Sequence, residues 1–578
     1  MTTRPTLPLL SATLCAALGL LPAASVAQEA VPGAQASAAS APPAGVAAQA
    51  PVPVPAATTG AGDALAQDQS LSVWMRDPVR TPDPQLVGDA ASDQAVRLLF
   101  EGLYRPGPDG LPLPAAATGH EVSADGLTWT FHLREGAVWS DGAPVTAADF
   151  VAGFRRLADP ALGSAGNWYT QVMGIANADA VVRGAAPTSD LGVAAVDERT
   201  LRVTLTAPAP WLDKAVMRSW TFPVPSAQMR AAAADGADWT DTDRLVGNGP
   251  FVLTSRDPEK GASFAPSARW HDAAAVRLSG IEIATGGDPD AALARFDAGE
   301  IDLMTVPGPL FGPWTEDRAE AAVAAPRACT NALVLNQSDK APEALRNPEL
   351  RRALSLAIDR EAIVAALKGG QSPAWGWVPP QIAGFTAPDA PEAGLTPEAR
   401  LAEAERLATV AGITADKPLR LTLNYNSAPE LEAVGQQIRA AWKPLGVELR
   451  LANAPWSDHA ETLKSGEFQI ARIGWCADVN DAGGFLRYFR QGGANPGRFA
   501  DADYDRLTAD AATSADPGPL QTRAAEILRD RLPMIPIFTY AAPMLVAPDL
   551  RGVARGDAMT GWSGQDIWRA AEQGDARP

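Results

Sequence analysis

Apolar and polar positions alternate with a period of two in several short stretches of the chain. The clearest is 127–133, where Leu127, Trp129, Phe131 and Leu133 share one face. Similar stretches predict strands at 69–73, 200–206, 251–255, 419–423 and 446–451.

Between these strands the apolar positions recur every three or four residues, as on one face of a helix. The helix predicted over 430–442 carries Leu431, Val434, Ile438 and Trp442 on that face. Thr146 and Asp149 resemble a capping box that opens another helix. Further helices are predicted at 91–101, at 288–299, and from Asn347 with an apolar stripe of Leu350, Leu354, Ile358 and Ile363. Short strands mixed with such helices indicate an α/β fold.

The N-terminal residues predict an exported protein. Residues 1–27 read as a signal peptide, with Arg4, an apolar run over 7–21 and a small-residue cleavage site ending at Ala27. That run is too short to span a membrane, and no later stretch offers about 20 apolar residues. Residues 28–70 are almost all Ala, Pro, Val, Gly, Gln, Ser and Thr, which predicts a flexible, disordered tether.

Composition excludes several functions. A formal charge of −19 argues against binding nucleic acid or anionic lipid surfaces. No Gly-x-Ser-x-Gly or His-Glu-x-x-His motif is present, so we expect no enzyme. The four histidines form no close cluster with one another or with cysteine, so we expect neither a metal site nor a cofactor; they are His120, His132, His271 and His459.

Two cysteines lie outside the leader, Cys329 and Cys476. In an exported chain they are natural disulfide partners, and in the chain-entropy account a loop of this length stabilises the fold by about 5 kcal/mol. Cys476 belongs to the heptapeptide 474–480, which places it beside Trp475 and Asp478. A carboxylate held on such a frame can pair with the ammonium group of a ligand.

Several spaced motifs resemble those of the family 5 (cluster C) extracytoplasmic solute-binding proteins of ABC importers. They occur in family order from about residue 71 to the C-terminus, at 100–103, 125–134, 139–150, 247–250, 299–302 and 357–360. The resemblance implies a three-domain fold like that of type II periplasmic binding proteins, with a hinged cleft between two lobes. Lobe I would comprise 71–104, 222–328 and 543–578, the appended domain II 105–221, and lobe III 329–542.

The resemblance also implies a function and its partners. The chain would be a periplasmic, monomeric binding protein that captures short peptides and delivers them to inner-membrane permease subunits of an ABC transporter. The heptapeptide and Cys329 match oligopeptide-binding members of the family, in which the matching cysteines form a disulfide. In those members the aspartate matching Asp478 pairs with the α-ammonium group of the peptide.

Other site positions follow from the same resemblance. Arg472 and Lys368 match groups that meet the C-terminal carboxylate of peptides of different lengths, and alternation places Arg472 on the same strand face as Gly474. Leu431 replaces a histidine of this set, which predicts weaker binding of the ligand length that ends there, or a preference for ligands without a carboxylate. Each position also has a structural interpretation: a capped turn for Asp478, an ion pair for Arg472, and a solvated helix end for Lys368.

The remaining positions concern side-chain pockets. Trp456 and Trp475 match tryptophans that line pockets, although core packing would also explain them. Ala332 and Val334 stand where the family carries a tyrosine and a glutamate, which predicts a roomier and less polar pocket. Alternatives within the family are binders of murein tripeptide, dipeptides, haem or nickel. A secreted peptidase or an added holdase role would be a different kind of function.

Overall fold

The computed structural model describes residues 64–414, 416–553, 559 and 561–571. The predicted signal peptide and residues 28–63 of the predicted tether lie outside the described residues. Residues 64–70, also predicted as tether, instead belong to the fold, because Leu65 bridges to Ala570 and β1 begins at Ser70. Within the described part of the chain, no helix is long and apolar enough to cross a membrane.

An eleven-stranded mixed sheet runs through the structure. The strands predicted at 69–73, 251–255, 419–423 and 446–451 are confirmed in it, with their ends shifted by a few residues. Its order is β15 (Val447–Ala454), β14 (Leu419–Asn426), β16 (Ile470–Cys476), β12 (Ala322–Leu335), β17 (Met534–Val546), β11 (Leu303–Thr305), β1 (Ser70–Met75), β10 (Gly280–Thr285), β9 (Gly261–Pro266) and β8 (Phe251–Asp257), and β13 (Ser372–Pro373) pairs with β17.

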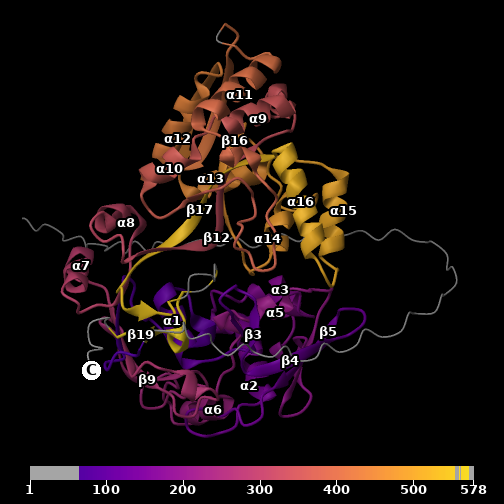
Figure 1. Cartoon of the computed structure of the whole chain (residues 1–578). Helices are drawn as coiled ribbons and strands as arrows, with labels where there is room; N and C mark the ends of the chain where they lie inside the picture. The colour runs from indigo at the N-terminus through magenta and orange to yellow at the C-terminus, as the bar shows by residue number, and fades with distance from the viewer. Residues whose placement is uncertain (1–63, 415, 554–558, 560, 572–578) are drawn as a thin grey trace, which may run out of the picture. The chain divides into compact units, whose positions relative to one another are not determined.

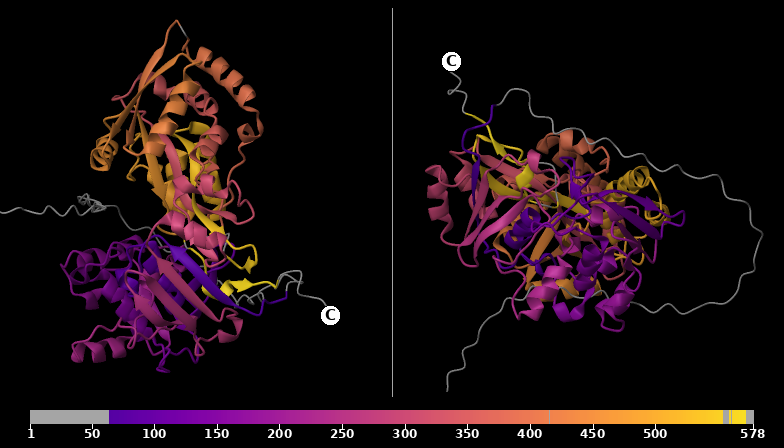
Figure 2. Two further views of the ribbon diagram at one scale, coloured as in Figure 1. Left: turned by 90° about the vertical axis from the view of Figure 1, so that its left-hand side faces the viewer. Right: turned by 90° about the horizontal axis from the view of Figure 1, so that it is seen from below.

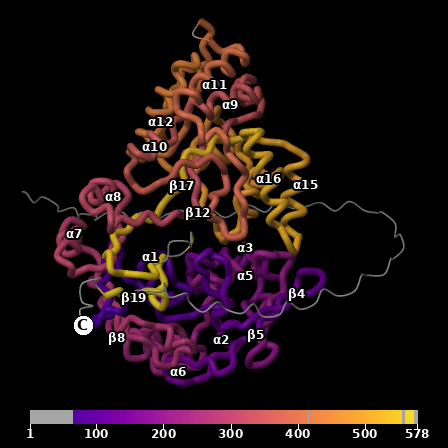
Figure 3. The backbone as a smooth tube through the Cα atoms, in the orientation of Figure 1, coloured from indigo at the N-terminus to yellow at the C-terminus, as the bar shows by residue number. Residues whose placement is uncertain are grey.

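The strands β12 and β17 connect the two halves of this sheet. They run antiparallel side by side, as the tube in Figure 3 shows. One end of β12, at 322–326, pairs with 541–545, and its other end, at 330–334, pairs with 534–539. The register shifts between Pro326 and Thr330, so the ladder is interrupted where one half of the sheet gives way to the other.

Helices pack against the half of the sheet that contains β14, β15 and β16 (Figure 1). One buried core joins these strands to the helices between residues 348 and 442. In this core Trp442 donates a hydrogen bond from Nε1 to the Leu354 carbonyl at 2.8 Å. The helices are α9 (Pro348–Leu356), α10 (Arg360–Leu367), α11 (Pro397–Val410), α12 (Pro429–Trp442), α13 (Trp456–Ser465), α14 (Ala482–Leu486), α15 (Ala502–Ala511) and α16 (Gly518–Arg531).

The helix predicted from Asn347 is in fact two helices, α9 and α10. Asp359 interrupts it, because its side chain accepts a hydrogen bond from the Ala362 amide at 3.0 Å and so caps a new helix. The predicted apolar stripe is buried nevertheless, including Ile358 between the two helices. The helix predicted at 430–442 is confirmed as α12.

A separate four-stranded sheet lies in the segment 117–204. It contains the predicted strand with Trp129, and its order is β4 (Ala117–Val122), β5 (Thr128–Leu133), β7 (Thr200–Thr204) and β6 (Val193–Ala195). The helix α2 (Ala147–Ala158) follows, and the predicted capping box is present, since the Asp149 carboxylate accepts the Thr146 amide at 3.0 Å. Shorter elements nearby are β2 (Tyr104–Pro106), β3 (Pro112–Pro114), α3 (Tyr169–Val172), α4 (Ala178–Val182), α5 (Leu212–Ala215) and α6 (Ser226–Ala234).

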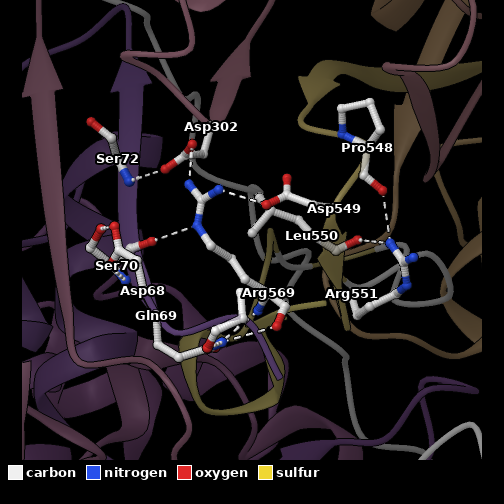
Figure 4. A network of polar contacts seen from close by, with 11 residues as sticks. Asp68, Gln69, Ser70, Ser72, Asp302, Pro548, Asp549, Leu550, Arg551 and Arg569 are labelled. Carbon is white, nitrogen blue, oxygen red and sulfur yellow. Dashed lines mark hydrogen bonds and ion pairs between the residues drawn. The ribbon is translucent and has the colours of Figure 1, made fainter. Parts of the chain in front are cut away.

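The two ends of the described chain meet beside β1. That strand lies between β10 and β11, and Figure 2 shows the indigo strand among strands of the magenta part of the chain. Arg569 forms ion pairs with Asp302 and Asp549 and donates to the Ser70 carbonyl at 3.0 Å (Figure 4). Asp302, the last residue of the 299–302 motif, also accepts the Ser72 amide at 2.7 Å. The motif therefore joins three distant segments. The other elements of this region are α1 (Ala90–Leu99), α7 (Pro289–Asp297), α8 (Gly308–Thr315), β18 (Leu550–Arg551) and β19 (Trp568–Arg569).

The motif 247–250 docks against the end of α1. Asn248 accepts the Glu101 amide at 3.0 Å and donates to the Glu101 carbonyl at 2.9 Å. A Cβ atom on Gly247 would lie 2.0 Å from the Leu99 carbonyl oxygen, so only glycine allows this approach. The motif is thus explained by packing.

Gly247→Ala is expected to destabilise the protein by about 1–3 kcal/mol, because the added methyl group forces the backbone apart. Urea unfolding followed by tryptophan fluorescence measures this loss. Gly119→Ala is the matched control, since nothing lies within 4 Å of a Cβ added there. Equal unfolding midpoints for the two variants would contradict the explanation.

Candidate functional site

The strand β16 has one edge that is only partly paired. Along its whole length it pairs with β12, from Ile470 to Cys476. On the other edge β14 pairs only with Ile470 and Ala471. From residue 472 to 476, that edge has no strand partner among the described residues.

The register shows which backbone groups face this open edge. Cys329 and Cys476 lie directly opposite each other with their Cα atoms 4.0 Å apart, a spacing of the non-hydrogen-bonded pairs of an antiparallel ladder. Because the two kinds of pair alternate, Gly474 belongs to the same kind as Cys476. The N–H and C=O groups of both residues therefore point away from β12, toward the open edge.

The predicted disulfide is present between Cys329 and Cys476. It joins β12 to β16 beside the interrupted register of β12 and β17. The open edge of β16 is thus attached covalently to the strand that connects the two halves of the sheet.

Asp478 lies just beyond the C-terminal end of β16 and faces arginines. Its Oδ2 lies 3.2 Å from an Nη atom of Arg487, and its side chain is 26% exposed. Its carbonyl oxygen accepts a hydrogen bond from the Tyr169 hydroxyl at 3.4 Å. Burial raises the pKa of the Asp478 carboxyl above 3.8, and the charges of Arg487 and Arg218 oppose that rise. The carboxylate therefore binds a cation here, rather than the backbone amides of a turn.

Arg472 lies on β16 and is held by neutral groups. Its guanidinium donates to the Asn426 side chain at 2.9 Å and to the Tyr540 hydroxyl, which also accepts from Asn331 at 3.2 Å. Its Nε is buried without a hydrogen-bond partner. Among the described residues no carboxylate lies within 4 Å of it, so the structural interpretation as an ion pair is wrong for Arg472. Its positive charge is available to a ligand.

The two tryptophans differ in environment. Trp456 begins α13 and is 53% exposed, which excludes core packing as its role. Trp475 is half-buried against Tyr488, with ring centroids 4.9 Å apart, and its Nε1 has no hydrogen-bond partner. His459 donates a hydrogen bond from Nε2 to the Arg472 carbonyl oxygen at 2.8 Å, which holds α13 against β16.

The other predicted site residues lie elsewhere. Lys368 ends α10 in the left-handed region, with a φ of 52°, and its ammonium group pairs with Glu316 at 3.1 Å. Leu431 is buried in the core beneath α12. Ala332 and Val334 are fully buried in the core that contains Phe485, so their placement does not support the predicted roomier pocket.

Sequence reasoning missed four neighbours of this site. Tyr540 lies in an apolar run that predicts only a core strand, and Asn331 lies in a similar run. Arg487 and Asn426 carry no motif, and only their positions at the ends of α14 and β14 bring them to the site. In the described part of the chain, no group of three or more His, Cys, Asp or Glu residues could hold a metal ion.

Comparisons with known proteins place this geometry in a family. Residues 112–497 match the bacterial extracellular solute-binding proteins, family 5 (middle region). The chain is 33% identical over 508 residues to the periplasmic murein peptide-binding protein MppA of Escherichia coli strain K12, covering 86% of the chain and 92% of MppA. It is 32% identical over 512 residues to the periplasmic oligopeptide-binding protein OppA of the same organism, covering 87% and 93%. The probable deoxycholate-binding periplasmic protein YgiS, also from that strain, is 32% identical over 505 residues, covering 86% and 93%.

Solved structures agree. The unliganded open form of MppA matches with a TM-score of 0.83 and 31% identity, over 89% of this chain and 99% of MppA. Haemophilus influenzae OppA in complex with RPPGFSPFR matches with a TM-score of 0.60 and 27% identity, over 88% and 100%. The fold is that of the type II periplasmic binding proteins, as the sequence motifs predicted. Within that class, this chain belongs to family 5 of the bacterial extracellular solute-binding proteins.

Replacing both cysteines by serine is expected to lower the free energy of unfolding by about 2–5 kcal/mol, because the cross-link closes a long loop. Urea unfolding of the oxidised protein and of the variant measures the difference. Adding a thiol reductant should bring the unmodified protein to the midpoint of the variant and leave the variant unchanged. Coincident midpoints without reductant would show that the bond adds no stability.

Proposed function

We propose that this protein captures short peptides in the periplasm and delivers them to the membrane permease of an ABC importer. The observation that carries the proposal is the open edge of β16, with Arg472 on the strand and Asp478 just beyond its end. An extended peptide that adds to this edge pairs its backbone with Gly474 and Cys476 regardless of its side chains. The activity is binding and release, without a chemical reaction.

The two charged groups suit the two ends of a peptide. Asp478 pairs with the free ammonium group, and the guanidinium of Arg472 takes both oxygens of the terminal carboxylate. At about 3.3 Å per residue, six positions along the strand separate the two Cα atoms by about 20 Å. Peptides that engage both groups are therefore no longer than about six residues. Lys368 would serve ligands of another length, after release from Glu316.

The tryptophans account for tolerance toward side chains. Trp456 and Trp475 offer flat apolar faces that accept many shapes.

Closure over the ligand would use the interrupted pairing of β12 with β17. We propose the domain arrangement expected from the family motifs, with 71–104, 222–328 and 543–578 as lobe I, 105–221 as domain II and 329–542 as lobe III. The shift of register between Pro326 and Thr330 supports a hinge at that boundary. The protein would act as a monomer.

A binder of murein peptide is the second candidate. It is favoured by the 33% identity to MppA and by the buried Leu431. This leucine removes one of the cationic side chains expected to bind the C-terminal carboxylate of a peptide. Isothermal calorimetry with tri-, tetra- and pentapeptides, murein tripeptide and deoxycholate would distinguish the candidates. General peptide capture predicts comparable affinity for several unrelated peptides. Binding of murein tripeptide alone would support the second candidate.

Asp478→Asn is expected to weaken the binding of free-amine peptides by about 10- to 100-fold, because the enclosed ammonium group loses its counter-ion. N-acetylated peptides should bind the unchanged protein weakly and lose no further affinity in the variant. Asp503→Asn, on the exposed surface of α15, is the control and should bind normally. An unchanged dissociation constant for Asp478→Asn would refute the role of this residue.

Affinity should also depend on pH through Asp478. Its pKa is raised above 3.8 by burial, so its charge is lost on acidification at a higher pH than in an ordinary aspartate. Because only the ionised form attracts ammonium, affinity should be constant near neutrality and fall as the pH falls toward the raised pKa. The charged groups near Asp478 include Arg218, Arg487 and Arg490.

Calorimetry from pH 7 to 4 with a C-terminally amidated peptide checks this, since such a ligand has no carboxylate of its own to titrate. Asp478→Asn should show no decline over the same range. A decline of equal size in both proteins would assign it to another group.

A further inference from the structure

A cavity of about 210 Å³ lies beside Asp478. One wall comes from the segment 172–211, with the apolar side chains of Val172, Pro208 and Trp211. The other comes from 478–521, which carries all the charged groups of the cavity wall, namely Asp478, Asp481, Arg487 and Arg490. The proposed peptide site uses only the first of these.

The charges in this wall do not balance. Asp481 is already committed, since it pairs with the Lys214 ammonium at 3.2 Å and accepts hydrogen bonds from Gly483 and Gln521 at 2.8 and 3.1 Å. Asp478 pairs with Arg487 at 3.2 Å and lies near Arg218, whose guanidinium stacks over Trp220 at 5.0 Å and also interacts with the buried Asp93 carboxylate. Within the cavity wall, the one uncommitted carboxylate is therefore already paired with Arg487 before any ligand arrives.

Arg490 adds a second arginine to the cavity wall. Its side chain is half-buried in the cavity wall and has no hydrogen bond or ion pair with any side chain of the described residues. A guanidinium that lines a cavity without a partner keeps its charge and its donors for a ligand. The cavity is therefore prepared for an anion next to the carboxylate that receives the peptide amine.

The consequence for a peptide depends on its first residues. A neutral N-terminal residue brings only an ammonium group, which must compete with Arg487 for Asp478. A residue that also brings a carboxylate can take Arg487 and Arg490 while its ammonium takes Asp478, so every charge is paired. The forked geometry of arginine suits such a carboxylate.

We propose that this cavity binds a carboxylate carried by the first or second residue of the peptide, so that the protein selects ligands that are acidic near their free amine. Arg490 and Arg487 hold the carboxylate, and Trp211 and Pro208 contact its methylene groups. This specificity rests on the proposed function and deepens it. Because the arginines are partly exposed, the expected preference is about 5- to 10-fold rather than larger.

Calorimetry with matched peptide pairs tests the selectivity. Asp-Ala-Ala is compared with Asn-Ala-Ala, and Ala-Glu-Ala with Ala-Gln-Ala, so that each pair differs only in the acidic group. In at least one of the two pairs, the unmodified protein is expected to bind the acidic peptide about 5- to 10-fold more tightly than its amide counterpart. Arg490→Gln should bring that ratio close to one. Arg487→Gln should lower it by weakening the acidic ligand and also by freeing Asp478 for the neutral one.

Arg523→Gln is the control, because that arginine lies on the exposed surface of α16 and pairs with Glu526. It should leave the ratio unchanged, and thermal melting should confirm that all three variants are folded. Equal binding of both members of each pair by the unmodified protein would overturn the selectivity and leave peptide capture intact. No binding of any free-amine peptide would instead overturn the proposed function itself. An unchanged ratio of the two affinities in folded Arg490→Gln and Arg487→Gln would show that these arginines do not bind the acidic side chain.

Discussion

The pairing of β16 with β12 is the constraint on which the site depends. It fixes which backbone groups of β16 form hydrogen bonds with β12 and which remain free, because hydrogen-bonded and non-hydrogen-bonded pairs alternate along an antiparallel ladder. The Cys329–Cys476 bond holds this register at the end of the strand where Asp478 follows. A slip of one residue would turn Gly474 toward β12 and move Arg472 to the opposite face.

The electrostatics of the site follow from what surrounds each charge. Arg472 is surrounded by hydroxyl and amide groups, which accept from its two Nη atoms and leave its charge uncompensated. Asp478 is surrounded by arginines, which compensate its charge before any ligand binds. The two ends of the proposed peptide site therefore differ. Arg472 has no counter-ion until a ligand carboxylate binds, whereas Asp478 exchanges its arginine partner for the ammonium group of the ligand.

Much of this was predictable from sequence, for identifiable physical reasons. Strands with a clean period of two, such as 419–423, and helices with a continuous apolar stripe, such as 430–442, appear as expected because one face of each is buried. The disulfide was predictable because only two cysteines remain outside the leader. The break at Asp359 was missed because the apolar stripe continues across it. Arg487, Arg490 and Tyr540 were missed because tertiary folding, rather than any local pattern, brings them to the site.

The contacts around Arg569 have a consequence for how the chain can fold. The strand β1 obtains its neighbours β10 and β11 from segments more than 200 positions later, and Arg569 meets Ser70 across 499 positions. A polypeptide that is synthesised from its N-terminus holds β1 without β10 and β11 until about half of the sequence has emerged, and without Arg569 until nearly all of it has. Such distant pairing makes assembly of this sheet slow relative to the local helices around α12. The strand β1, which is synthesised early, is thus among the last elements to obtain all its partners.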